Sequence, residues 1–325
     1  MQRIKGSFLY HCHQLRQALA AVGAEAMLPF DSFEVLARKG GEHHRFSPRF
    51  LAIKDGVRRY GDSLNNETDS FAGWMPYQRK NWLIAVDKLA FKQFSREADL
   101  QVPDYSFMPD SALKNVIIKR ANGAFGTRMH GPFLRAGQYK LDMLAGEFYE
   151  RFIEGSIAKI WFWNAEPICM EHDAMPSVTG NGIATIGQLI SRKMARRRRL
   201  SEPEAAEILA GRQEILAFYG VDINNVLPDK QRLIIEFRYG SDFMESWDRK
   251  TIYFERQPAH VHLAELKKTG LRLQEAIPAT IRKDTLFTVD AIIDKEQKLW
   301  FLEMNCNPVV HPLVYAAMAK SVVGN

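Results

Sequence analysis

The alternation of hydrophobic and polar positions predicts strands and helices in an irregular order. Two mainly apolar segments within residues 287–308 flank a polar turn centred between Glu296 and Gln297, a pattern that predicts a β-hairpin. A second hairpin is predicted over 157–170, and a buried strand over 116–119. Because strands and helices do not alternate as in βαβ units, the pattern favours an α+β fold over a doubly wound sheet.

Start and stop signals set the ends of the predicted helices. The expected N-caps are Asp87, Thr185 and Ser201, and the expected C-terminal glycines are Gly23, Gly220 and Gly270. We predict helices over 12–22 and about 259–269, a strand over 233–238, and loops with short strands over 38–78. Residues 1–85 are interpreted as a separate N-terminal unit, because the pattern becomes clear only from Asp87.

The length and composition are those of a globular chain with two or three subdomains, since 46% of the 325 residues are apolar. No run of about 18 apolar residues predicts a membrane span, and the N-terminus has no secretion signal. The cysteines, Cys12, Cys169 and Cys306, have neither zinc-site nor disulfide-framework spacing. We therefore expect a reduced, cytoplasmic protein.

The net charge of +6 is concentrated in one stretch that contains Arg192, Lys193 and the run Arg196–Arg199. Such a run is typical of a solvated helix or loop; the alternative is a patch that attracts an acidic substrate or nucleotide phosphates. Nucleic-acid binding is not favoured, because no aromatic residues interleave with the arginines. The histidines predicted to lie on the surface are His11, His13, His43 and His44.

Candidate chemistry lies in the C-terminal hairpin. Its predicted turn sets Asp290 opposite Glu303, and alternation puts both on one face with Asn305. That face also carries Thr288, Ile292 and Phe301, and the apolar face carries Val289, Ala291, Ile293, Trp300, Leu302 and Met304. Because like charges across a ladder repel, we expect a cation between the acids, and oxygen ligands suit Mg²⁺. The alternative is two solvated acids on an open sheet face.

Two lysines are candidates for binding phosphate. Lys119 ends a predicted strand just before a loop with Gly123 and Gly126, whose amides can surround oxyanions; the alternative is a surface lysine. Lys88 stands in the first turn of a helix, where the helix dipole prefers acids, so a bound anion is one explanation for its position. The common P-loop motif is absent.

Six ordered elements from Asp87 to Pro312 resemble the ATP-grasp superfamily, most closely the cyanophycin synthetase and bifunctional glutathione synthetase type. The elements are D-K-L-A-F-K with a following V-P, V-I-I-K-R-A-N-G-A-F-G-T, Y-E-R-F-I-E-G, P-S-V-T-G-N-G-I-A-T-I-G-Q-L-I, D-A-I-I-D and L-E-M-N-C-N-P. The sequence departs from the family pattern at Asn181, Phe125 and Ile157. In the family, an acid at the position of Ile157 often binds the ribose. In this sequence Glu154 is the candidate to make that contact instead.

The resemblance implies an ATP-grasp fold, in which two α+β subdomains grip ATP, preceded by a smaller N-terminal domain. The implied divisions are 1–85 for the N-terminal domain, which is the candidate for substrate selection, 86–155 for the central subdomain with its mobile glycine loop, and 156–325 for the C-terminal subdomain with the metal site.

The resemblance also implies which residues bind the nucleotide. Lys88 and Lys119 would hold the ATP phosphates, the glycine loop would cover them, and backbone groups of 151–153 would bind adenine. The full implied set is Lys88, Lys119, Gly123, Ala124, Phe125, Gly126, Thr127, Glu150, Arg151, Phe152, Ile153 and Glu154.

The implied catalytic residues are Arg238 and Lys119, which would stabilise charge at the reaction centre. For Arg238, the alternative is a strand-end ion pair with Glu236 or Asp242. The implied ligands of two Mg²⁺ ions, with Mn²⁺ as a substitute, are Asp290, Glu303 and Asn305.

The implied activity is the ATP-dependent joining of a carboxylate to an amine through an acyl phosphate, on an amino acid or peptide substrate. Two alternatives stay open: phosphoryl transfer to another acceptor by the same fold, and a non-catalytic protein that binds a nucleotide or nucleic acid. The expected partners are small-molecule or peptide substrates, with no membrane partner, and a homo-oligomer is compatible with the sequence.

Overall fold

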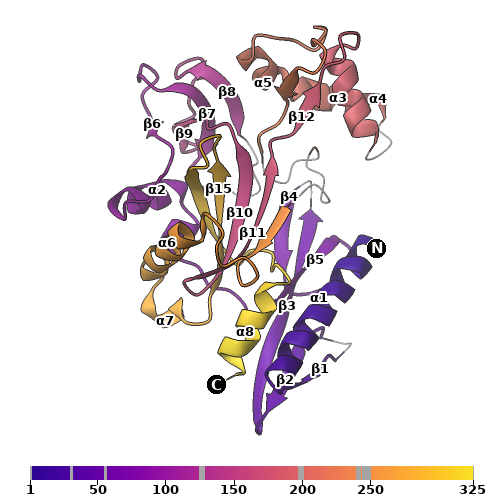
Figure 1. Cartoon of the computed structure of the whole chain (residues 1–325), viewed down its shortest axis with the longest axis vertical. Coiled ribbons are helices and arrows are strands. Elements are labelled where there is room, and N and C mark those ends of the chain that lie inside the picture. The colour runs from indigo at the N-terminus through magenta and orange to yellow at the C-terminus, as the bar shows by residue number, and fades with distance from the viewer. Residues whose placement is uncertain are drawn as a thin grey trace.

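The computed structural model describes residues 2–29, 32–54, 57–123, 129–196, 201–238, 243 and 250–324. Helices and antiparallel sheets are mixed without βαβ alternation, which confirms the predicted α+β class. The N-terminal sheet lies below the central five-stranded sheet, and two smaller sheets lie above it (Figure 1). Within the described ranges, no helix combines the length and the apolar character that crossing a bilayer requires.

The N-terminal unit packs one helix on a five-stranded sheet. Its elements are α1 (Gln2–Ala21), β1 (Glu25–Met27), β2 (Val35–Lys39), β3 (Glu42–Lys54), β4 (Val57–Gly61) and β5 (Thr68–Met75). The prediction of loops and short strands over 38–78 is wrong for β3, which has 13 residues and pairs with β2, β4 and β5. The middle of β3 is buried on both faces, so it lacks the simple alternation of a half-exposed strand.

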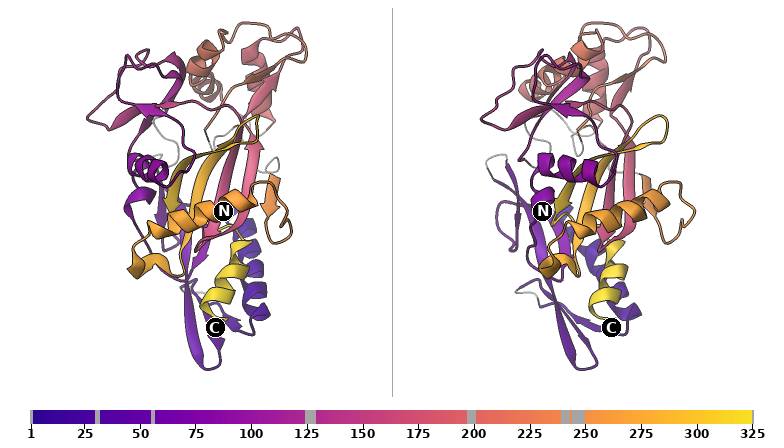
Figure 2. Two further views of the ribbon diagram at one scale, coloured as in Figure 1. Left: turned by 60° about the vertical axis from the view of Figure 1, so that its left-hand side comes forward. Right: turned by 90° about the vertical axis from the view of Figure 1, so that its left-hand side faces the viewer.

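The N-terminal unit shares its core with the last helix, α8 (Val314–Val322). Phe46 and Phe50 of β3 belong to one buried cluster with Leu19 of α1 and with Tyr315 and Met318 of α8. Helices α1 and α8 lie side by side in both sets of views (Figures 1 and 2). Elements from opposite ends of the sequence are therefore stabilised by the same apolar contacts.

A four-stranded sheet, in the order β6-β9-β7-β8, follows along the chain. Its elements and the helices before it are η1 (Leu83–Ala85), α2 (Lys88–Glu97), β6 (Tyr105–Ser106), β7 (Lys114–Arg120), β8 (His130–Arg135) and β9 (Glu147–Arg151). The predicted cap of α2 is confirmed, because the Asp87 carboxylate accepts from the amides of Leu89 at 2.8 Å and Ala90 at 3.0 Å. This cap fixes where Lys88 begins the helix.

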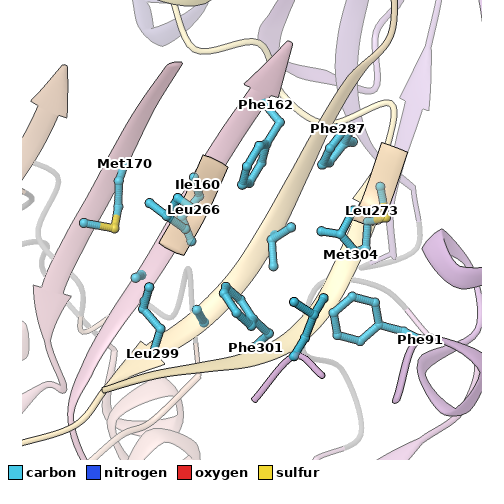
Figure 3. Packing of buried hydrophobic residues seen from close by; sticks show 14 of the residues in the cluster. Phe91, Ile160, Phe162, Met170, Leu266, Leu273, Phe287, Leu299, Phe301 and Met304 are labelled. Carbon is cyan, nitrogen blue, oxygen red and sulfur yellow. The ribbon is translucent and has the colours of Figure 1, made fainter. Parts of the chain in front are cut away.

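The central sheet has the order β14-β11-β10-β15-β16. Its elements and the helices that follow β14 are β10 (Ser156–Trp163), β11 (Glu166–Ala174), β14 (Lys250–Tyr253), α6 (Leu263–Glu275), α7 (Ala279–Arg282), β15 (Leu286–Ile293) and β16 (Leu299–Cys306). Figure 3 shows Leu266 of α6 over Ile160 and Leu273 of α6 beside Met304, in the buried cluster that also contains Phe162 and Phe287. With one face covered in this way, the charged side chains of the strands lie on the other face.

The C-terminal hairpin contains an irregularity that the sequence pattern did not reveal. Asp290 lies opposite Glu303 as predicted, but the register then shifts and Ala291 pairs with Phe301. Leu302 is the additional residue of this β-bulge. The face predicted for Phe301 is therefore wrong: it joins the core with Ala291, and Trp300 lies opposite Ile292.

A small lobe of helices lies beside a two-stranded sheet. Its elements are β12 (Ser177–Thr179), α3 (Ile186–Ala195), α4 (Glu202–Ala210), α5 (Gln213–Phe218) and β13 (Arg232–Ile234). The capping boxes predicted at Thr185 and Ser201 are confirmed. Arg192 lies in the last turn of α3, and the arginines at 197–199 lie outside the described residues.

Three predicted boundaries are wrong. Helix α1 begins ten residues before Cys12, at Gln2, and the strand predicted over 233–238 is limited to β13. Gly270 does not end a helix but lies inside α6. A Cβ atom there would lie 2.0 Å from the Ala165 carbonyl oxygen, so close packing on the sheet explains this glycine.

His11 is buried, contrary to the prediction of a surface position, and only 4% of it is exposed. The Tyr315 hydroxyl accepts from the Trp74 amide at 3.0 Å and lies 2.8 Å from His11 Nδ1. Burial, helped by the charge of His311, lowers the pKa of His11 to about 4. The folded protein therefore holds this imidazole neutral.

This burial predicts a loss of stability in mild acid. Between pH 6.5 and about 4 the unfolded chain binds a proton at His11 that the folded chain does not, so the free energy of unfolding falls as the pH falls through this window. The loss from this residue is about 3 kcal/mol. Urea unfolding gives the free energy of unfolding at each pH from 7.5 to 4. This free energy should fall less steeply with falling pH in His11→Gln than in the parent protein.

The exposed His13 offers a matched control. His13→Gln should keep the parental pH dependence of unfolding. If the free energy of unfolding depended on pH in the same way in the parent protein and in His11→Gln, the assignment of the acid-induced loss of stability to His11 would be contradicted.

Candidate functional site

The two predicted acids face each other across the hairpin. Asp290 of β15 is paired with Glu303 of β16, and the side-chain amide of Asn305 donates to Asp290 Oδ2 at 3.1 Å. All three residues are half-buried. The sheet thus brings together the oxygen-bearing groups predicted to bind metal, on the face opposite α6.

A row of charged side chains crosses four strands at this level. Glu171 of β11 is paired with Lys159 of β10, Lys159 with Asp290, and Asp290 with Glu303. Lys159 Nζ lies 2.6 Å from Asp290 Oδ1, and Lys88 Nζ lies 2.9 Å from Glu303 Oε2. The cationic charge that the opposed acids were predicted to need is therefore supplied here by two lysines, of which Lys159 was not foreseen.

These lysines have different effects on the two acids. Burial alone would raise the pKa of Glu303, but Lys88 and Lys119 lower it to about 2. Burial raises the pKa of Asp290, with Glu303 adding to the effect and Lys159 opposing it. Glu303 is therefore the firmly ionised member of the pair, while Asp290 depends on the cations around it.

Lys88 connects the acidic pair to the start of the glycine loop. Its amide donates to the Ala121 carbonyl at 2.9 Å, and its Nζ donates to the Gly123 carbonyl at 2.7 Å. Gly123 is the last described residue before the predicted phosphate-covering residues Ala124–Thr127, which lie outside the described ranges.

A fully buried ion group lies behind this loop. Glu150 of β9 is 0% exposed, and its two carboxylate oxygens lie 2.5 Å from Lys92 Nζ and 2.7 Å from Lys119 Nζ. We call these three residues the lysine triad. Burial would raise the pKa of Glu150, but the two lysines lower it, and burial lowers the pKa of Lys92. With both lysines protonated, the ionised carboxylate leaves one positive charge in surplus.

A second group of the same kind involves Arg238. Glu236 is 2% exposed and pairs with Arg212 and, at 3.4 Å, with Arg238 Nη1. We call these residues the arginine triad. The ion pair considered for Arg238 on sequence grounds thus exists, but Arg238 also donates to the Met129 carbonyl at 3.0 Å. Lys88 and Arg238 therefore contact the described residues on either side of 124–128.

The predicted adenine-binding segment is partly engaged by the protein itself. The Arg151 amide donates to the Asp104 carbonyl at 2.8 Å, and the Phe152 amide to the Asn115 carbonyl at 2.5 Å. Ile153 belongs to a buried apolar cluster, and Glu154 Oε1 accepts from the Tyr219 hydroxyl at 2.7 Å. Because the amides of Arg151 and Phe152 are already hydrogen-bonded within the chain, the backbone groups near Ile153 are the remaining candidates for contacts with adenine.

Sequence reasoning did not assign roles to Lys92 or Asn307. The second lysine of D-K-L-A-F-K is Lys92, and only its complete burial distinguishes it from a surface lysine. Asn307 has a positive φ of 49° and bonds both the amide and the carbonyl of Lys80, at 2.9 Å and 2.7 Å. No group of three or more His, Cys, Asp or Glu residues positioned for a metal occurs in the part of the chain that the structure describes.

No protein-family model matches the chain, and no curated protein matches it in sequence. Among solved structures, bifunctional glutathione synthetase from Pasteurella multocida has 15% identity and a TM-score of 0.42, over 95% of this chain and 43% of that one. D-alanine–D-alanine ligase from Bacillus anthracis, complexed with ATP, has 12% identity and a TM-score of 0.36, over 74% of this chain and 65% of that one.

The ATP-grasp ligase PsnB, complexed with a minimal precursor, has 12% identity and a TM-score of 0.39, over 73% of this chain and 60% of that one. The chain thus spans less than two-thirds of the length of each of these three structures. The similar solved structures are ATP-grasp ligases.

The lysine triad yields a stability prediction. Glu150→Gln removes the anion that lies between Lys92 and Lys119 and leaves two buried cations together, which should lower the free energy of unfolding by about 3–5 kcal/mol. Adding Lys92→Met to this variant removes one of those cations and should restore part of the loss. Chemical denaturation measures both changes.

The exposed Glu97 provides the control. Glu97→Gln should change the free energy of unfolding by less than about 0.5 kcal/mol. A Glu150→Gln protein as stable as the Glu97→Gln protein would show that the triad is not held by charge.

Proposed function

We propose that this chain is an ATP-dependent ligase that joins a carboxylate to an amine. The observation that carries the proposal is the combination of the buried lysine triad, the partly buried arginine triad, each with a surplus positive charge, and a pair of opposed acids. Buried charge without a counter-ion is costly, so the arrangement calls for an anionic ligand beside the cations. ATP with Mg²⁺ supplies both the anion for the triads and the cation for the acids.

Several contacts link the cations to the acidic pair. Lys119 of the lysine triad lowers the pKa of Glu303, and Lys88 contacts both Glu303 and the Gly123 carbonyl. A triphosphate offers Lys88 a stronger acceptor than the neutral Gly123 carbonyl, because hydrogen bonds between two charged groups are the stronger ones. Lys88, Lys119 and Arg238 are therefore the proposed phosphate ligands.

The acidic pair fits magnesium by its chemistry. Asp290, Glu303 and Asn305 present carboxylate and amide oxygens on one sheet face, and hard divalent ions prefer such ligands. Bound there, Mg²⁺ would neutralise charge on the phosphates. These three residues would hold it, with Lys159 available to compensate Asp290 when the ion is absent.

In the proposed reaction, a carboxylate oxygen of the acid substrate attacks the γ-phosphorus of ATP, the bond to ADP breaks, and an acyl phosphate forms. An amine nitrogen then attacks the acyl carbon, phosphate leaves, and the nitrogen loses a proton. Arg238 and Lys119 would hold phosphoryl oxygens while negative charge shifts between them. This chemistry requires no covalent nucleophile from the chain.

Nucleotide binding is tested by Lys119→Met. Loss of a charge-assisted contact should weaken binding of a non-hydrolysable Mg-ATP analogue at least about 10-fold, measured by isothermal titration calorimetry. Lys114 lies on the same strand and is exposed, so Lys114→Met should bind the analogue as the parent does. Equal affinities in the two variants would remove Lys119 from the phosphate site.

Turnover is tested by Glu303→Gln, with Glu296→Gln in the exposed turn as the matched control. Incubation with Mg-ATP and pooled amino acids and dipeptides should yield new amide masses with the parent and the control. Product formation should fall at least about 100-fold in Glu303→Gln, in a protein that still folds.

Undiminished amide formation in Glu303→Gln would overturn the metal assignment. Transfer of phosphate to a stable new product by the parent protein, without any amide, would instead indicate a phosphotransferase.

A further inference from the structure

One buried arginine lies outside the two triads. Arg49 of β3 is 2% exposed. Because side chains alternate along a strand, Arg49 lies on the face of the N-terminal sheet opposite Phe50, which packs in the core with α1. Leu51 lies on the same face as Arg49. Tyr60 of β4 is paired with Leu51 and therefore also lies on this face. The N-terminal unit therefore has an apolar face toward α1 and a face with a cation and an aromatic ring.

None of the contacts of Arg49 among the described residues is an ion pair. Its Nη1 donates to the Asn307 carbonyl at 2.7 Å and lies 4.0 Å from Met75 Sδ, and its guanidinium lies 4.5 Å from the centre of the Tyr60 ring. Its Nε has no hydrogen-bond partner in the part of the chain that the structure describes. Among the described residues, no carboxylate lies within ion-pair distance of Arg49.

The charges around Arg49 do not cancel the effect of its burial. Burial lowers the pKa of Arg49; Tyr60, Tyr77 and Asp62 oppose this effect, and Arg79, which donates to the Tyr60 carbonyl at 3.3 Å, adds to it. A buried guanidinium without an anion is costly. The fold has retained this cost, which points to an anion that is not part of the described chain.

Arg49 lies close to the proposed reaction centre. The residue whose carbonyl it binds, Asn307, is two positions after Asn305. Burial raises the pKa of Tyr60, and the charges of Lys159 and Asp290 also influence it, so the ring that covers Arg49 adjoins the row of charges on the central sheet. An anion at Arg49 would therefore lie beside the opposed acids.

We propose that Arg49 binds the carboxylate of the amine substrate, which is therefore an amino acid or a peptide with a free C-terminus. The inference rests on the proposed ligase function. A planar guanidinium with a free Nε matches the two oxygens of a carboxylate. The side chains in direct contact with Arg49, Tyr60 and Met75, are uncharged, and the nearby Arg79 is accompanied by the acidic Asp62, so the net charge there suits a monoanion better than a phosphate dianion. The carboxylate that reacts is consumed, whereas this one persists, so a fixed cation can hold it through both steps.

Binding is tested by the Nε–H resonance of Arg49 in ¹⁵N-labelled protein saturated with Mg²⁺ and a non-hydrolysable ATP analogue. Loss of one resonance in Arg49→Lys assigns it. The probes are single amino acids and dipeptides with free carboxylates, and the same compounds as C-terminal carboxamides. A saturable shift with a free acid and none with its carboxamide is the expected result.

Three results would overturn the proposal: no shift with any free acid, equal shifts with acid and carboxamide, or the same shift with inorganic phosphate alone. Failure of the ligase function has a different signature. The analogue would then fail to bind, or would bind equally well to Lys119→Met, whatever the Arg49 resonance does.

Kinetics separate binding from a structural bond to Asn307. In Arg49→Gln the KM for the amine substrate should rise at least about 10-fold, while the KM for ATP and the preference among acid substrates stay unchanged. The preference for free acid over carboxamide in the amine substrate should disappear. A purely structural role would reduce activity on both forms equally and preserve that preference.

Arg45 on the same strand is exposed and pairs with Glu34 at 3.5 Å. Arg45→Gln should leave both KM values and the carboxamide discrimination as in the parent. If Arg49→Lys restores the discrimination only in part, the fork geometry of arginine, and not its charge alone, is responsible.

Discussion

The site depends on two carboxylates that an antiparallel ladder holds face to face. Asp290 and Glu303 cannot separate without breaking the pairing of β15 with β16, so their repulsion must be compensated from elsewhere. Lys159 does this from the neighbouring strand and Lys88 from the start of α2. Three elements that are distant in sequence are thereby placed around one pair of acids.

The same principle recurs in the lysine triad and in the arginine triad. In each, one carboxylate lies between two cations, with Glu150 between lysines and Glu236 between arginines. One carboxylate balances only one of its two partners, so a positive surplus remains in a low-dielectric interior, where electrostatic interactions are strong. The cations are held in place before any ligand arrives, and preorganised charge of this kind is effective in catalysis.

The sequence allowed the fold class, both capping boxes and the opposition of Asp290 with Glu303 to be predicted, because each depends on short-range periodicity or on fixed spacing. Lys159, Glu150 as an ion partner and Arg49 could not be foreseen, since their partners lie on other elements. The face of Phe301 was missed because a single-residue bulge has no signature in the hydrophobic pattern. His11 was misplaced because its burial depends on Tyr315, 304 positions away.

That distant contact has a consequence for how the chain is made. The hydroxyl of Tyr315 bonds both His11 and the Trp74 amide, and α8 contributes Val314 and Met318 to the core of the first sheet. As domains fold from the N-terminus during synthesis, the leading strands emerge from the ribosome long before the helix that completes their core. Strands β2, β3 and β5 thus leave the ribosome well before α8 and become fully packed only after it has followed.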